Sequence, residues 1–101
     1  MARVDKKLER WANNTPKHAP KEDVLAIIER FFSRQYKQTS SSHIVIQDDR
    51  LGGYPECGPA GDFTVVISGG QKVKGHYLRR LAQIIRFLEE LKNEKGFRIL
   101  P

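Results

Sequence analysis

The chain has 101 residues with 39% apolar and 30% charged side chains, a composition typical of one globular domain with a modest core. No apolar run reaches the roughly 18 residues that a membrane span needs, and no apolar segment near the first residues indicates a secretion signal. The net charge is +6. The single cysteine, Cys57, cannot form an internal disulfide, which favours a cytoplasmic protein. One cysteine and three dispersed histidines argue against a structural zinc site, and we expect no other cofactor and no membrane partner.

A short helix is predicted over residues 4–13, because Val4, Leu8 and Trp11 recur on one helical face. The Asn-Asn-Thr-Pro sequence at residues 13–16 would end it, and residues 15–19 are expected to form a linker. Residues 1–19 are therefore interpreted as an N-terminal helix and linker that precede the main domain.

A second helix is predicted over residues 20–34. Pro20 suits the first helical position, where its missing N–H costs nothing, and Glu22 and Asp23 suit the first turn. Five large apolar residues follow at helical spacing and are predicted to enter the core: Val24, Ile27, Ile28, Phe31 and Phe32.

Three strands are predicted next. Residues 35–38 form an edge strand, and residues 41–47 its hairpin partner, in which Ile44 and Ile46 face the core while His43 and Val45 face the other way. Residues 48–61, with four glycines and two prolines, are predicted to be an exposed loop. The alternating pattern of residues 62–68 predicts the third strand. The loop carries three acidic residues that fit no calcium or zinc template: Asp48, Asp49 and Glu56.

A final helix is predicted to follow a Gly-Gly break at residues 69–70, with residues 71–74 leading into it and Gly96 ending it. The order of elements predicts an α+β fold with a three-stranded antiparallel sheet and helices on one face. The expected organisation is a single α-β-β-β-α domain over residues 20–96 and a C-terminal tail over residues 97–101.

The strongest charge excess lies in residues 62–86, which sum to +4 and include five basic residues: Lys72, Lys74, Arg79, Arg80 and Arg86. A cluster of this kind is typical of a surface that binds a phosphate backbone. Charge alone does not separate such a surface from one that is simply solvated.

Three motifs, together with the order of elements, resemble HicA-type (YcfA-like) mRNA interferase toxins over roughly residues 8–92. The motifs are Ser-Ser-His-Ile-Val-Ile at 41–46, Phe-Thr-Val-Val-Ile at 63–67, and Gly-Gly-Gln-Lys-Val-Lys at 69–74 before Tyr-Leu-Arg-Arg-Leu at 77–81. The resemblance implies a fold of the double-stranded-RNA-binding type and an endoribonuclease of a toxin–antitoxin system that acts in the stress response. It also implies mRNA as substrate and a HicB-type antitoxin as partner.

The family's Gly-Ser-His motif corresponds here to Ser41, Ser42 and His43, so the resemblance implies that His43 cleaves RNA. As a general base without a metal, its neutral imidazole would accept the 2′-hydroxyl proton while that oxygen attacks phosphorus. Nearby cations and backbone N–H groups at Gly75 and His76 would stabilise the added negative charge. The candidate RNA-binding residues are Ser41, Ser42, Lys72, Lys74, Arg79 and Arg80.

Two other classes of function fit the same sequence. If Ser41, in place of the family glycine, disables the site, the chain is a non-catalytic RNA-binding module of the same fold. Alternatively, it is a protein-interaction domain whose basic face meets an acidic partner. RNA cleavage separates the first class from an enzyme, and salt-dependent RNA binding separates both from the second.

Overall fold

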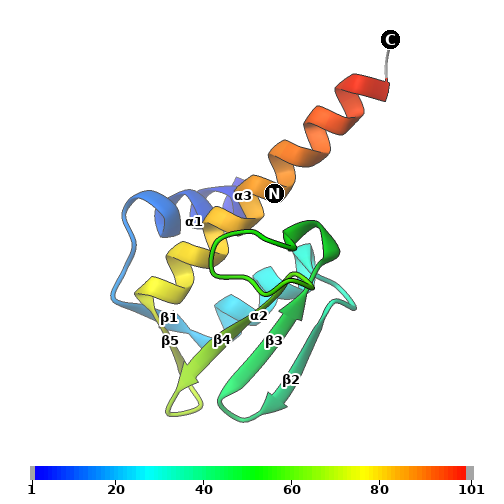
Figure 1. The fold of residues 1–101 in the computed structure, drawn as a ribbon. Coiled ribbons are helices and arrows are strands. Elements are labelled where there is room, and N and C mark those ends of the chain that lie inside the picture. The colour runs from blue at the N-terminus through cyan, green and yellow to red at the C-terminus, as the bar shows by residue number, and fades with distance from the viewer. Residues whose placement is uncertain (1, 100–101) are drawn as a thin grey trace.

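The computed structural model describes the backbone of residues 2–99 and the side chains of residues 6–91, so the packing predicted for Val4 lies outside the described side chains. Within this range one antiparallel sheet has the strand order β1-β5-β4-β3-β2, and the fold is α+β as predicted (Figure 1). The strands are β1 (His18–Pro20), β2 (Tyr36–Ser40), β3 (His43–Gln47), β4 (Asp62–Ser68) and β5 (Lys72–Lys74). The helices are α1 (Ala2–Asn13), α2 (Lys21–Phe31) and α3 (Gly75–Ile99), with a 3-10 turn, η1 (Asp49–Leu51).

The sheet has one buried face and one open face. Ile44 pairs with Val65 and Ile46 pairs with Phe63, and all four side chains are buried. The residues between them along β3 and β4 point to the opposite side and are exposed or half-buried. The alternation predicted for these two strands is confirmed, because a period of two places every second side chain on the same face.

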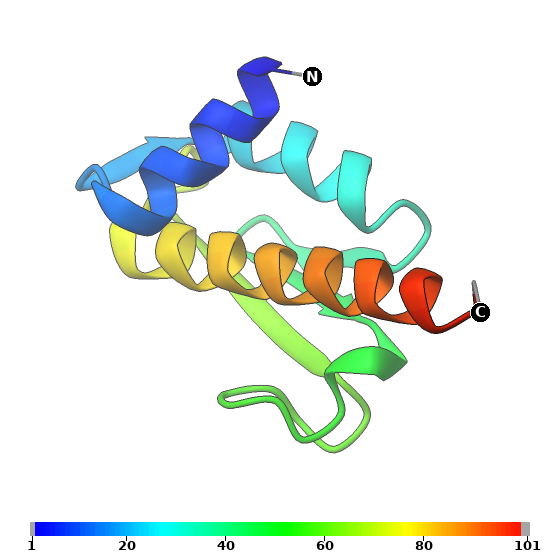
Figure 2. The same cartoon turned by 90° about the horizontal axis from the view of Figure 1, so that it is seen from above.

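The helices supply the other half of the core. Helices α2 and α3 pack against the buried face and α1 packs along α3, so that helices lie on one side of the sheet (Figure 2). Trp11 of α1 is only 2% exposed and joins the same core as Phe32 and Leu78. None of the helices within residues 2–99 has an apolar stretch long enough to cross a bilayer.

The prediction of only three strands was wrong, because two three-residue strands extend the sheet. Ala19 of β1 pairs with Val73 of β5, and Ile67 of β4 pairs with the same Val73. Residues 18–20 are therefore an edge strand and not a linker, and residues 72–74 are a strand that leads into α3. The amide of Gly75 closes this corner by donating to the Lys17 carbonyl at 2.8 Å.

Two helix ends also differ from the prediction. Helix α2 ends at Phe31 and not at residue 34, because Arg34 has a left-handed φ of 66° that turns the chain into β2. Helix α3 continues through Gly96 to Ile99, although the prediction placed its end at Gly96 and a tail at residues 97–101. A glycine inside a helix costs only about 1 kcal/mol, which a long helix tolerates.

The segment 48–61 is anchored, and the prediction of an exposed acidic loop is incorrect for Asp48. Leu51 is fully buried, and Asp48 is 3% exposed because its carboxylate binds Arg50. Farther along, the ring of Tyr54 packs on Phe87 of α3 with centroids 4.7 Å apart. The segment therefore lies against α3 and leaves the open face of the sheet uncovered.

Candidate functional site

The open face of the sheet carries the polar and basic residues of the strands. His43, Val45 and Gln47 of β3 lie on this face because Ile44 and Ile46 point into the core. In Figure 1, α2 lies behind β3 and β4, and the face turned away from α2 carries no helix. The orientation predicted for His43 is therefore the one that the structure shows, with its side chain exposed.

The His43 ring is oriented by the hairpin that precedes it. Its Nδ1 lies 3.1 Å from the Ser40 hydroxyl oxygen, and that oxygen accepts a hydrogen bond from the Ser42 amide at 3.2 Å. A hydroxyl oxygen has two lone pairs, so it can also accept from Nδ1–H. In that tautomer, the lone pair of Nε2 is free to accept a proton.

Sequence reasoning missed Ser40 as the partner of His43. The contact arises because the register of β2 and β3 shifts between Gln38 and Ser40, which places Ser40 opposite His43. The prediction placed residues 41–42 in a strand and not in a turn, and no residue pattern indicates the register shift. The strand predicted over residues 41–47 therefore begins only at His43, and Ser41 and Ser42 lie in the turn that precedes it.

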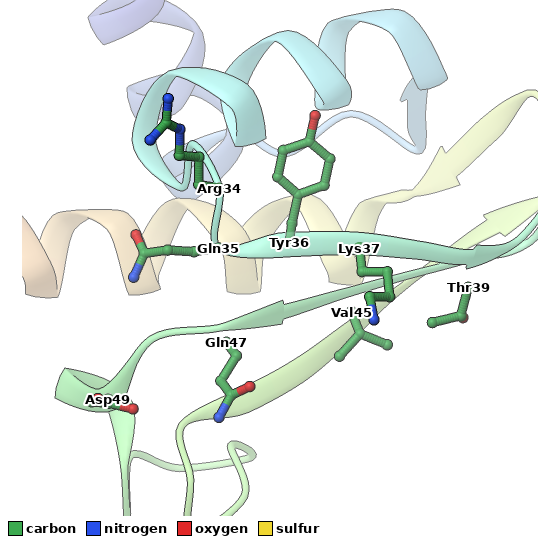
Figure 3. A pocket seen from close by; sticks show the side chains of 8 residues that line it. All are labelled: Arg34, Gln35, Tyr36, Lys37, Thr39, Val45, Gln47 and Asp49. Atoms are coloured by element: carbon green, nitrogen blue, oxygen red, sulfur yellow. The ribbon is translucent and has the colours of Figure 1, made fainter.

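A hollow of about 470 Å³ lies along β2 and β3; His43 is not among its lining residues, but Val45, two residues along β3, is. Figure 3 shows that Lys37, Val45 and Gln47 extend to the same side of this strand pair, whereas the Tyr36 ring points toward the helices. Thr39 also lines the hollow. The lining is mostly polar, with two cations (Arg34 and Lys37), one acid (Asp49) and one aliphatic side chain (Val45), which suits a polar ligand better than an apolar one.

Cations flank His43 on both sides. Lys37 pairs with Val45, two residues along from His43, and diagonal neighbours of this kind lie about 7–8 Å apart. On the other side His43 pairs with Val66, and Lys74 on β5 lies one strand farther, about 10 Å from His43 at the usual strand spacing. Lys72 and Lys74 are exposed and share the open face with His18, which pairs with Lys74.

The structure does not bring Arg79 and Arg80 to His43. Both belong to α3, on the covered side of the sheet, where Arg79 donates to the Thr15 hydroxyl at 3.2 Å and Arg80 pairs with Glu56. The Gly75 amide, predicted as a donor to the reacting phosphate, already binds the Lys17 carbonyl. These groups hold α3 to the rest of the fold.

The three acidic residues of segment 48–61 have separate roles. Asp48 binds Arg50, Glu56 binds Arg80, and Asp49 lies at the rim of the hollow. Within the described residues, no three His, Cys, Asp or Glu side chains gather as a metal site would require. Burial raises the pKa of the Cys57 thiol, which opposes formation of a thiolate.

No family model matches the chain, and neither curated proteins nor solved structures give a significant match. The chemistry of the open face therefore carries any functional assignment.

Proposed function

We propose that the chain is a HicA-like endoribonuclease that binds single-stranded mRNA on the open face of the sheet and cleaves it with His43. The observation that carries this proposal is an exposed imidazole, oriented by Ser40, between Lys37 on one side and Lys74 on the other. The α2-β2-β3-β4-α3 order further supports a fold of the double-stranded-RNA-binding type, extended here by β5 and β1.

The reaction follows from the free Nε2 of His43. With Nδ1–H donating to Ser40, Nε2 accepts the proton of an RNA 2′-hydroxyl while O2′ bonds to the adjacent phosphorus. The bond from phosphorus to O5′ breaks, and the departing O5′ takes up a proton. The products are a 2′,3′-cyclic phosphate and a 5′-hydroxyl. Lys37 and Lys74 offset the negative charge that builds on the phosphate oxygens.

The backbone conformation of Ser41 is compatible with this proposal. Among the described residues other than glycine, positive φ occurs at Arg34 and Glu56, so Ser41 has an ordinary backbone conformation. A serine therefore fits this turn without the strain that would require glycine. A HicB-type antitoxin is the proposed protein partner, and an acidic surface on it would complement Lys37, Lys72 and Lys74.

The test is cleavage of a single-stranded RNA in the presence of EDTA by the wild-type protein and by His43→Ala. We expect loss of cleavage in the variant with an unchanged thermal melt, because His43 is exposed and outside the core. DNA of the same sequence, and RNA methylated at the 2′-oxygen, should stay intact because each lacks the attacking hydroxyl.

A matched control is His76→Ala, because His76 is exposed at the start of α3, where its ring stacks on Tyr77 with centroids 4.0 Å apart. It should cleave like the wild type. Equal cleavage by the wild type and His43→Ala would refute the role of His43. Salt-dependent RNA binding without any cleavage would favour the non-catalytic RNA-binding module, and absence of RNA binding would favour the protein-interaction domain.

A further inference from the structure

A second basic surface lies at the β1 edge of the sheet, in a groove of about 540 Å³ between α1 and β1. Trp11, Pro16 and Ala19 form its apolar part. Its charged rim has three cations from α1 and a single acid, Asp23 of α2, which gives a net charge of +2 when His18 is neutral. The cations are Lys6, Lys7 and Arg10.

Two of the three cations are available to a ligand. Lys7 pairs with Asp23 at 3.4 Å, so these two charges largely cancel. Lys6 and Arg10 are exposed and stand four residues apart, which places them on the same side of α1. The groove therefore presents two cations in a row beside an apolar floor.

The groove is continuous with the open face of the sheet. His18 and Pro20 line the groove, and in β1 they pair with Lys74 and Lys72, the cations beside the proposed cleavage site. In the strand order, β3 and β1 are three strand spacings apart, so His43 on β3 lies about 14 Å from β1 at the usual spacing between strands. A stacked strand rises about 3.4 Å per nucleotide, so about four nucleotides cover this distance.

We infer that an RNA strand bound at His43 continues across β5 and β1 into the groove, where Lys6 and Arg10 contact its phosphates. This inference rests on the proposed function of the open face. An RNA strand fits better than an acidic peptide because the two basic surfaces share β1 and are separated by a span that a few nucleotides cover. The groove thus makes binding depend on RNA length.

The test uses the His43→Ala background, so that binding is measured without cleavage. Fluorescent oligouridylates of about two nucleotides, too short to reach the groove from His43, and of about twelve nucleotides are titrated against that protein and against Lys6→Gln/Arg10→Gln. We expect the double variant to bind the longer RNA about tenfold more weakly and the short RNA unchanged. Its salt dependence on the longer RNA should fall by about 1.4 in slope, for two lost phosphate contacts to a single strand.

Two matched variants control for charge and for position. Arg30→Gln/Arg86→Gln removes the same charge from exposed positions on α2 and α3 and should bind both lengths normally. Lys72→Gln/Lys74→Gln should weaken both lengths, because these residues lie next to the cleavage site. An equal loss on both lengths for the groove variant, or the same loss in the Arg30 and Arg86 control, would overturn the inference.

The outcomes also separate this inference from the proposed function. If the wild type does not cleave RNA but the groove variant loses affinity for the longer oligomer alone, the groove stands as an RNA site and catalysis by His43 falls. If the wild type cleaves and the groove variant binds both lengths normally, only the groove assignment is wrong. Binding of poly-glutamate at the groove with no RNA binding would overturn it in favour of an acidic protein partner.

Discussion

Asp48 is expected to be the polar residue whose removal most destabilises the segment after β3. Its carboxylate accepts three hydrogen bonds from Arg50: from the backbone N and from Nε at 3.0 Å each, and from Nη2 at 2.7 Å. The bond from the Arg50 backbone N is the cap of η1, and loss of such a cap costs about 1 kcal/mol. The Arg50 side chain is 40% exposed, so water replaces the lost ion pair, at a cost of about 0.2–1 kcal/mol. Asp48→Ala should therefore lower the free energy of unfolding by about 1–2 kcal/mol.

Urea unfolding followed by tryptophan fluorescence measures this effect, because Trp11 is the single tryptophan and is buried in the core. The unfolding midpoint should fall with little change in slope, and the melting temperature should drop by about 4–8 °C per kcal/mol. Asp48→Asn keeps an acceptor for the Arg50 amide and should lose about half as much. A loss below about 0.5 kcal/mol in Asp48→Ala would refute this account of the segment.

The ion pair between Asp48 and Arg50 also predicts that the stability of the fold depends on pH. The hydrogen bonds from Arg50 hold the pKa of the Asp48 carboxyl below its ordinary value. A lowered pKa in the folded state means that the stabilisation is complete above the unfolded-state pKa, about 3.9, and is lost as the pH falls through the lower folded value. The difference in stability between the wild type and Asp48→Asn should therefore be constant from about pH 5 to 8 and shrink in acid. A difference that grows in acid would contradict the assigned ion pair.

Two further substitutions test the backbone of segment 48–61 and the orientation of His43. Gly61→Ala should destabilise the fold by at least about 2 kcal/mol in urea unfolding, because the φ of Gly61 is 80° and an added Cβ would lie 1.9 Å from the Asp48 carbonyl oxygen; a wild-type midpoint would contradict this. Ser40→Ala should slow cleavage about tenfold with an unchanged melt, whereas Ser40→Thr, which keeps the hydroxyl, should retain activity. Equal rates for both Ser40 variants would show that the hydroxyl does not position the imidazole.

The central strands and the long helix follow from sequence alone because their patterns are long. Seven alternating residues in β4 determine which face is buried, and the pair Ile44 and Ile46 does the same for β3. The short strands β1 and β5 were not predictable in this way, because three residues are too few for a period. Ala19 and Val73 pair across more than fifty residues of sequence, and only the folded chain brings them together.

The orientation of His43 was predictable, but its surroundings were not. Its outward direction follows from the isoleucine next to it, whereas Ser40 reaches it through a register shift and Lys74 through a strand that the sequence did not reveal. Local patterns determine the face on which a side chain lies. They do not determine which residues from other strands lie beside it.

The charge distribution along the sequence likewise does not show which cations lie together in the fold. The excess of +4 in residues 62–86 suggested one basic cluster, yet the fold divides it. Lys72 and Lys74 lie on an open strand, whereas Arg79 and Arg80 begin a helix on the covered side, where they bind Thr15 and Glu56. The basic track proposed for RNA instead combines cations from separate segments: Lys37 of β2, Lys72 and Lys74 of β5, and Lys6 and Arg10 of α1. Strand order, and not sequence distance, places Lys37, Lys72 and Lys74 on one face of the sheet, and the proposed track reaches Lys6 and Arg10 of α1 across β1 at the sheet edge.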